Sequence, residues 1–147
     1  MYFWNIEKLK KTLQKGPLTE AEAFKYLFVT TIAWCMGYIQ FGEYNIFDVY
    51  FSLILVVLEI LGLIYAYKCN GGAKGKNFLQ IYISIAWVVS IRWIVLVMIP
   101  CLAIYITALV IYSTVPEVTT LQDIIFSSLL LVSYFWLLGK HIKDLAK

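Results

Sequence analysis

The sequence predicts an all-α integral membrane protein with four transmembrane helices and an N-terminal amphipathic helix that lies in the membrane interface. Of its 147 residues, 62% are hydrophobic and only 14% are charged, whereas a soluble domain is near 45–50% apolar and about 25% charged. Long apolar runs with few charges are typical of transmembrane helices. We expect residues 1–17 to form a cytoplasmic amphipathic segment and residues 18–147 to form a four-helix transmembrane domain.

The first predicted element covers residues 5–15, NIEKLKKTLQK. Ile6, Leu9 and Leu13 share one helical face, and Asn5 is a candidate N-cap. A basic helix that follows Tyr-Phe-Trp is typical of a segment in the membrane interface. A helix packed on a neighbouring subunit or on a partner fits the same pattern.

Three of the predicted transmembrane helices have clear boundaries. Thr19 and Glu22 form a capping box, in which each side chain satisfies a free amide at the start of a helix, and this box opens the first one. The predicted spans in these three helices cover about residues 24–41, 47–67 and 122–139.

The remaining apolar segment, residues 78–112, is too long for a simple span. It holds 35 residues and one charge, so a continuous helix would be roughly 52 Å long, against a bilayer core of about 30 Å. We predict a single helix kinked near Pro100, with a span over about 84–112. The projecting start is apolar, so we expect it to pack on the N-terminal helix, another subunit or a partner.

The distribution of charge predicts the topology. With a cytoplasmic N-terminus, all eleven lysines fall on inner segments, while the outer loops hold acids and no positive residue. The positive-inside rule therefore favours four spans with both termini in the cytoplasm. We expect the host membrane to be the cytoplasmic membrane of a bacterium.

Two charges, Glu59 and Arg92, remain well inside the apolar spans. Buried charges in a membrane usually pair or face a protein interior, so we predict an ion pair between them, within or between subunits. Their depths match if the first two turns of the 78–112 helix project into the cytoplasm. Glu59 shares a helical face with Ser52, Gly62 and Ala66, where small residues allow a close neighbour.

A second set of polar residues lies along the last helix, at spacings of four, seven and seven. These residues share one face, which would suit a proton or ion path. Interhelical hydrogen bonds with polar helix ends are the other interpretation, and His141 is read as an interfacial residue and not as a metal ligand. The stripe consists of Asp123, Ser127, Tyr134 and His141.

The loop KCNGGAKGKN is glycine-rich and basic, but it lacks the Gly and the Ser or Thr of a phosphate-binding loop. We expect a flexible cytoplasmic turn whose lysines, Lys68, Lys74 and Lys76, attract anionic headgroups or an acidic partner. No catalytic motif or metal-ligand cluster occurs, so we expect no enzyme activity, no cofactor and no metal. The absence of a basic stripe with interleaved aromatics argues against nucleic-acid binding.

These observations predict a small non-enzymatic membrane subunit that forms a homo-oligomer. We expect it to act as a sensor, an anchor or a pore-forming effector, with a cytosolic protein partner on its basic inner face. In size and predicted topology it resembles the small four-span membrane subunits of bacterial antiviral defence systems, which implies a role in defence or stress. The alternative is a small ion- or proton-coupled transporter or channel that uses Glu59, since one acidic membrane residue in four short spans resembles the small multidrug transporters. Arg92 argues against cation export, because it would neutralise that site.

Overall fold

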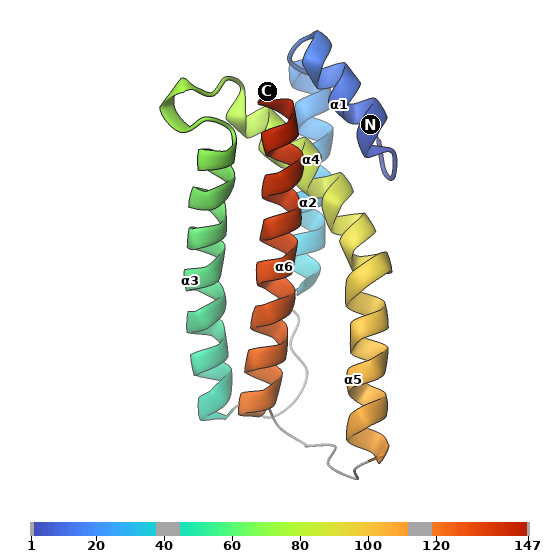
Figure 1. The fold of residues 1–147 in the computed structure, drawn as a ribbon, viewed down its shortest axis with the longest axis vertical. Coiled ribbons are helices and arrows are strands. Elements are labelled where there is room, and N and C mark those ends of the chain that lie inside the picture. Colours follow the sequence, from blue (N-terminus) through green and yellow to red (C-terminus); the bar gives the residue numbers. More distant parts are fainter. Residues whose placement is uncertain (1, 38–44, 112–118, 147) are drawn as a thin grey trace.

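The computed structural model describes residues 2–37, 45–111 and 119–146, and the elements within these ranges are all helical (Figure 1). Two short helices, α1 and the 3₁₀ turn η1, lie at the end of the molecule that carries both termini. The elements in chain order are α1 (Ile6–Lys15), α2 (Glu20–Gly37), α3 (Ile46–Cys69), η1 (Gly72–Lys74), α4 (Phe78–Trp93), the π-helix η2 (Ile94–Met98), α5 (Ile99–Ile111) and α6 (Leu121–Leu145).

Within the described ranges, three helices are long and apolar enough to cross a membrane, which indicates a membrane protein. They are Ile46–Cys69, the continuous helix Phe78–Ile111 and Leu121–Leu145. The predicted first span, residues 24–41, is only partly covered, because α2 is described up to Gly37 and residues 38–41 lie outside the described ranges. α2 is not among the three candidates.

The most extensive helix contact joins α3 to α6, and it is built from two glycines and two aromatic rings. The ring of Phe135 on α6 packs on Gly62 so closely that a Cβ there would overlap it. One turn further along, the ring of Tyr65 on α3 packs on Gly139 of α6 in the same way. Each helix thus supplies one gap and one ring, which fixes their relative register.

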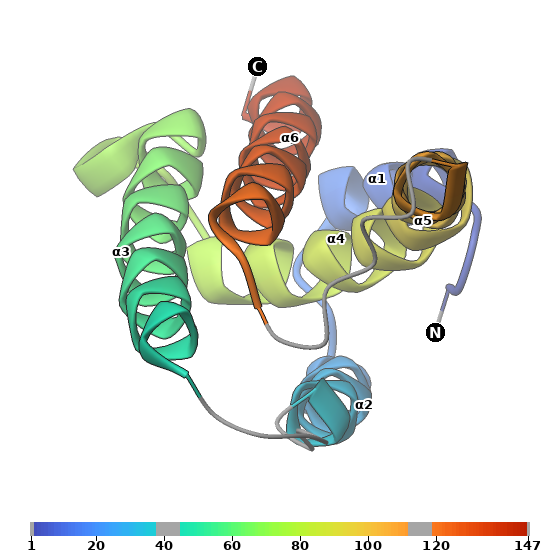
Figure 2. The ribbon, with the colours of Figure 1, turned by 90° about the horizontal axis from the view of Figure 1, so that it is seen from below.

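α6 is the central helix of the described structure, since α1, α3 and α4 all contact it. Seen along the bundle, α3 and α6 lie next to each other, while α2 and α5 lie apart from this pair (Figure 2). At the end remote from the termini, Thr119, which precedes α6, is hydrogen-bonded to the start of α3. The Asn45 side-chain amide donates to the Thr119 carbonyl at 3.0 Å, and the Thr119 hydroxyl donates to Asp48.

The long helix 78–111 is inclined in its first half and bends before its second. α4 crosses α6 obliquely, whereas α5 runs nearly along α6 (Figure 1). Between them lies the π-helical turn η2, in which the amide of Ile99 donates to the carbonyl of Ile94. This turn directly precedes Pro100, whose missing N–H and bulky ring disturb a regular helix. The predicted single helix is confirmed, and its interruption begins six residues before the proline.

α1 packs within the same chain, on α4 and α6. Ile6 and Leu9 are buried, and the ring of Phe3, just before the helix, meets Trp87 of α4 edge-on at 6.1 Å. Asn5 caps α1 as predicted, accepting a hydrogen bond from the amide of Lys8 at 2.9 Å. The N-terminal segment therefore covers α4 around Trp87, while Leu79 at the start of α4 stays 71% exposed, so the packing expected for the first two turns stays a prediction.

The capping box at the start of α2 is also confirmed. The amide of Thr19 donates to the Glu22 carboxylate at 3.2 Å, and the amide of Glu22 donates to the Thr19 hydroxyl at 3.3 Å. The hydrogen bonds from the backbone and hydroxyl of Thr19 lower the pKa of the Glu22 carboxyl below its usual value. The box thus holds a negative charge at a helix N-terminus, where the helix dipole favours it.

We expect Gly62→Ala and Gly139→Ala each to lower the free energy of unfolding in detergent by about 1–3 kcal/mol, because the added methyl group displaces an aromatic ring. The loss should exceed the gain of about 1 kcal/mol in helix propensity from alanine. Thermal unfolding followed by circular dichroism measures the change. Gly16→Ala is the control, since no atom lies within 4 Å of its added Cβ. Equal stability of all three variants would contradict the interlock.

Candidate functional site

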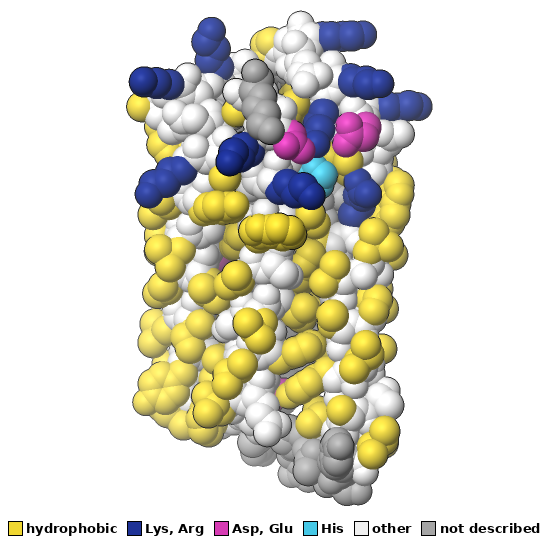
Figure 3. Space-filling view, in the orientation of Figure 1, with side chains coloured by type: hydrophobic (Ala, Val, Ile, Leu, Met, Phe, Trp, Pro, Cys, Tyr) yellow, Lys and Arg dark blue, Asp and Glu magenta, His cyan; other side chains and the backbone are white. Residues whose placement is uncertain are grey.

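The candidate site comprises two polar regions that lie on different sides of α6. One is centred on Glu59 of α3, and the other on Arg92 of α4. The lysine and arginine side chains gather at the end of the molecule that carries both termini, above a largely apolar body (Figure 3).

Glu59 lies on α3, close to the interface of α3 with α6. Its carboxyl is partly buried, and it is within electrostatic range of Tyr82 on α4 and Tyr134 on α6. Gly62, one turn away, packs on Phe135 of α6, so Glu59 occupies the side of α3 near this interface. The predicted small-residue face is confirmed at Gly62 and Ala66, which are both buried.

Two hydrogen bonds join α4 to α6 within the apolar body. The Ser90 hydroxyl donates to the Tyr134 hydroxyl at 3.1 Å, and the indole N–H of Trp93 donates to the Ser133 hydroxyl at 2.9 Å. The rings of Trp93 and Tyr134 also meet edge-on, with centroids 5.8 Å apart. Together they hold the oblique crossing of α4 over α6 in one register.

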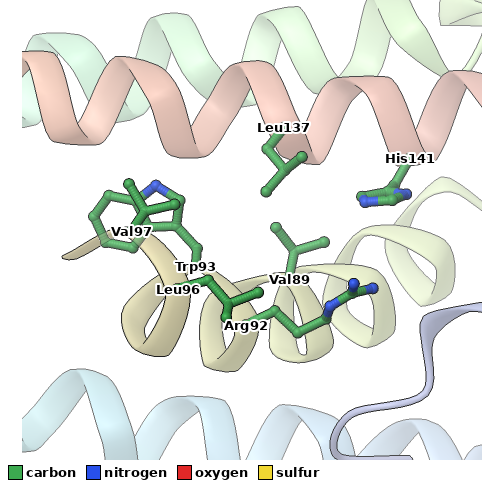
Figure 4. A pocket seen from close by; sticks show the side chains of 7 residues that line it. All are labelled: Val89, Arg92, Trp93, Leu96, Val97, Leu137 and His141. Atoms are coloured by element: carbon green, nitrogen blue, oxygen red, sulfur yellow. The ribbon is translucent and has the colours of Figure 1, made fainter. Parts of the chain in front are cut away.

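Arg92 lies at the opposite side of α6, in a pocket of about 200 Å³ between the α4–η2 segment and α6. Its guanidinium is stacked over the Trp4 ring, with Cζ 5.9 Å from the ring centroid. Arg92 and His141 lie at one end of this pocket, and Trp93 and Val97 lie at the other (Figure 4). The remaining lining residues are Val89, Leu96 and Leu137.

Glu59 and Arg92 do not pair within the chain. Among the residues that the structure describes, the ion pairs are formed by Lys10, with Glu7 and Asp144. The physical reason is the oblique path of α4: it begins near α3, passes behind α6 and emerges on the far side (Figure 1). Equal depth in the membrane would place Glu59 and Arg92 side by side only if α3 and α4 ran nearly parallel. A pair between two copies of the chain stays a prediction.

Three of the four stripe residues on the last helix meet the long helix 78–111, each at a different level. Asp123 accepts a hydrogen bond from the Tyr105 hydroxyl of α5 at 2.8 Å, Tyr134 is bonded to Ser90 of α4, and His141 lines the pocket of Arg92. Interhelical hydrogen bonds at Asp123 and Tyr134 are the second of the two interpretations offered by the sequence. Ser127 is partly buried on the same helix.

The basic loop is ordered around Asn70, a buried residue whose side-chain amide donates to the Lys76 carbonyl at 3.4 Å. Gly71 and Gly72 take the left-handed conformation, with φ of 92° and 58°, which glycine adopts without a steric penalty. This compact turn leaves the side chains of Lys68, Lys74 and Lys76 exposed. None of the three lysines lines the Arg92 pocket: Lys68 lies in the last turn of α3, and Lys74 and Lys76 lie in the turn between α3 and α4.

Several contacts around the pocket were not predicted from the sequence. Lys10 is buried, with 8% of its surface exposed, and its ammonium is 3.0 Å from Asp144 on α6. The contact of Trp4 with Arg92 is the second of these contacts. The burial of Lys10 could have been predicted, because Lys10 follows Leu9 and lies next to the apolar face of α1. Its partner could not, because Asp144 is 134 residues away in the chain.

The described ranges contain no group of three His, Cys, Asp or Glu side chains that could hold a metal ion. Comparisons of the chain with protein-family models, curated proteins and solved structures gave no match.

We expect Tyr134→Phe to lower the free energy of unfolding by about 0.6 kcal/mol, and by no more than about 1.7 kcal/mol, because it removes one interhelical hydrogen bond in an apolar setting. The ring and its contacts with Trp93 and Phe135 are retained. Equilibrium unfolding in mixed micelles, followed by tryptophan fluorescence, measures the effect. Tyr50→Phe on the exposed surface of α3 is the control and should change nothing. A loss of the same size in both variants would show that the Ser90–Tyr134 bond contributes no stability.

Proposed function

We propose that the chain is a small, non-enzymatic membrane subunit with four spans that forms a homo-oligomer and acts as a sensor, an anchor or a pore-forming effector. The single observation that supports oligomerisation is the position of α5. Among the described helices, α5 continues from η2 and reaches α6 through Tyr105, whose ring stacks on Phe126 at 4.4 Å. Much of its apolar surface is exposed, including Ile104 and Ile111, each at 71%. A helix of a second copy would complete the packing around it.

The proposed orientation places both termini in the cytoplasm. It is supported by the concentration of lysine and arginine side chains at the end with the termini (Figure 3), in keeping with the positive-inside rule. In this orientation α1, the C-terminal end of α6 and the loop with Lys68, Lys74 and Lys76 face the cytoplasm. We propose that a cytosolic protein with an acidic surface binds this end, since opposite charges guide such encounters.

The fourth span belongs to the proposal as well. α2 starts with charged residues and becomes apolar after Lys25, and it packs on α4 through a surface that includes the buried Tyr26. The Tyr26 hydroxyl accepts a hydrogen bond from the amide of Tyr2 at 2.8 Å, which ties the start of α2 to the N-terminal segment. In the proposed topology α2 continues across the bilayer, and the host membrane is a bacterial cytoplasmic membrane. By the resemblance in size and predicted topology, the subunit serves a defence or stress system.

The oligomer is tested by disulfide cross-linking in native membranes. In a chain with Cys35, Cys69 and Cys101 replaced by alanine, we expect Ile104→Cys on α5 to give a covalent dimer after mild oxidation. The matched control is Leu79→Cys, which is equally exposed at 71% but lies at the start of α4. A dimer from the α5 variant alone supports the proposed packing. Monomer from both variants, together with a monomeric mass in native mass spectrometry, would overturn it.

A second candidate function, a proton- or cation-coupled transporter or channel, is favoured by the surroundings of Glu59. Arg92 would oppose such a function if it neutralised the Glu59 carboxylate, but the two residues form no ion pair within the chain. An acidic side chain inside membrane helices is a candidate for ion or proton binding. Tyr82 and Tyr134 lie within electrostatic range of the carboxyl.

For this candidate we expect Glu59→Gln to abolish proton flux in liposomes that contain the pH-sensitive dye pyranine, under a potassium diffusion potential set by valinomycin. Glutamine has nearly the shape of glutamate but cannot exchange a proton, so a site that cycles a proton on this residue stops. Glu22→Gln is the control, because that carboxyl lies in the capping box at the start of α2. Undiminished flux in the Glu59 variant, or no flux above empty liposomes in the unmodified protein, would exclude this function for proton transport.

A further inference from the structure

Arg92 carries the one guanidinium of the sequence, and its surroundings contain no acidic partner among the described residues. The two acids of this region, Glu7 and Asp144, are both engaged by Lys10, at 3.6 and 3.0 Å. A charge at the level of membrane helices is costly unless it is neutralised. The arrangement therefore calls for an anion that the described residues do not supply.

The pocket has a polar end and an apolar end. Arg92 and His141 lie together at one end, and the other is formed by apolar side chains of α4, η2 and α6 (Figure 4). Its volume of about 200 Å³ is below the range of roughly 300–1,000 Å³ that encloses a whole small molecule. The ligand that fits is one of which only a part enters, while the rest continues along the surface. On that surface, Leu96 is 58% exposed and Val95 is 45% exposed, so an apolar strip leads away from the pocket.

The polar end is prepared to donate hydrogen bonds to an anion. The Arg92 Cζ lies over the Trp4 ring, 5.9 Å from its centroid, and this contact uses none of the N–H donors of the planar guanidinium. Nδ1 of His141 is buried and has no hydrogen-bond partner among the described residues. Arginine suits phosphate because its planar fork makes two parallel hydrogen bonds to phosphate oxygens.

We propose that this pocket binds an anionic phospholipid of the inner leaflet. The phosphate accepts hydrogen bonds from Arg92 and from Nδ1–H of His141, and the start of one acyl chain lies on Leu137, Val97 and Leu96. Basic pockets between transmembrane helices on the cytoplasmic side suit such headgroups. The chemistry of the two ends matches that of the lipid, since phosphate and chain are joined in one molecule. The inference goes beyond the proposed function; its assignment to the inner leaflet rests on the proposed orientation, and it does not depend on the oligomeric state.

The pocket also links the lipid to the N-terminal segment. Trp4 precedes α1 and stacks on the same guanidinium that would hold the phosphate. α1 is in turn fixed to α6 by Lys10 and Asp144, three residues after His141. A bound phosphate would thus connect the N-terminal segment, through Trp4 and Arg92, to His141 near the C-terminal end of α6.

The test is a titration of the detergent-purified protein with phosphatidylglycerol and with phosphatidylcholine, read by native mass spectrometry. We expect one phosphatidylglycerol to bind more tightly than phosphatidylcholine. Arg92→Gln should weaken the binding of phosphatidylglycerol roughly tenfold, the size expected for the loss of hydrogen bonds to a charged group. The matched control is Lys140→Gln. It removes the same charge beside His141, but Lys140 is exposed and its ammonium lies over Trp136 at 5.9 Å, outside the pocket. It should change the affinity less than about twofold.

A second variant separates binding from folding. Leu137→Trp keeps Arg92 but fills the pocket, and it too should weaken phosphatidylglycerol binding about tenfold or more while helix content and elution volume stay unchanged. Equal effects of Arg92→Gln and Lys140→Gln would show that diffuse charge attracts the lipid, and this would overturn the proposal. So would an unchanged affinity in the Leu137 variant.

Two further arms decide the nature of the anion. Inorganic phosphate at millimolar concentration should not displace phosphatidylglycerol, because it lacks the chain. Displacement would show a site for free phosphate and would overturn the assignment to a lipid. If Arg92→Glu dissociates an oligomer and Glu59→Arg in the same chain restores it, the partner of Arg92 is Glu59 of a second copy, and the lipid proposal is wrong. Retained oligomer mass with lost lipid binding supports the lipid alone.

Discussion

The structure depends on the interlocking of α3 and α6 through Gly62, Phe135, Tyr65 and Gly139. Within a bilayer, lipid chains are as apolar as leucine, so burial of apolar side chains from water does not drive helices together. Close packing and hydrogen bonds remain, and both require backbones that can approach. The two glycines allow the backbones to approach. The ring of each helix packs on the glycine of the other. The pair fixes where α6 stands relative to α3, and α6 then provides the surface on which α4 and α1 are arranged.

The oblique crossing of α4 has the largest consequence for function. It carries Arg92 past α6, to the side where the N-terminal segment and His141 lie, and it leaves Glu59 among Tyr82 and Tyr134. The chain therefore holds two separate charged regions where one compact pair was predicted. A lone carboxyl in an apolar setting suits protonation or cation binding, while a lone guanidinium suits an anion. These two demands differ in chemistry, so the regions can serve different ligands and can be probed independently.

Features that depend on neighbours in the sequence were predictable. The N-cap at Asn5, the capping box of Thr19 and Glu22, and the small face at Gly62 and Ala66 each arise within one or two turns of helix, where spacing alone decides which groups meet. The continuity of the helix 78–111 followed from its composition, and its weak point followed from Pro100 to within a few residues. The Glu59–Arg92 pair was not predictable in the same way. The depth of a residue follows from its position along its own helix. Contact between two residues also depends on the direction in which their helices cross. Contacts between α4 and α6, such as Ser90–Tyr134 and Trp93–Ser133, set that direction for α4.

The sequence by itself determined that the chain is helical and that its helices include some long and apolar enough to cross a membrane, because long apolar runs with few charges are typical of transmembrane helices. It also determined that the basic residues gather at one end, because the lysines occur only in segments that the helices bring there. The tertiary structure alone decided which side chains surround Glu59 and Arg92. That choice rests on the tilt of α4, the bend at η2 and the fold of α1 over α4 and α6. These are set by packing between residues far apart in the chain, and no periodicity along one helix encodes the angle at which it meets another.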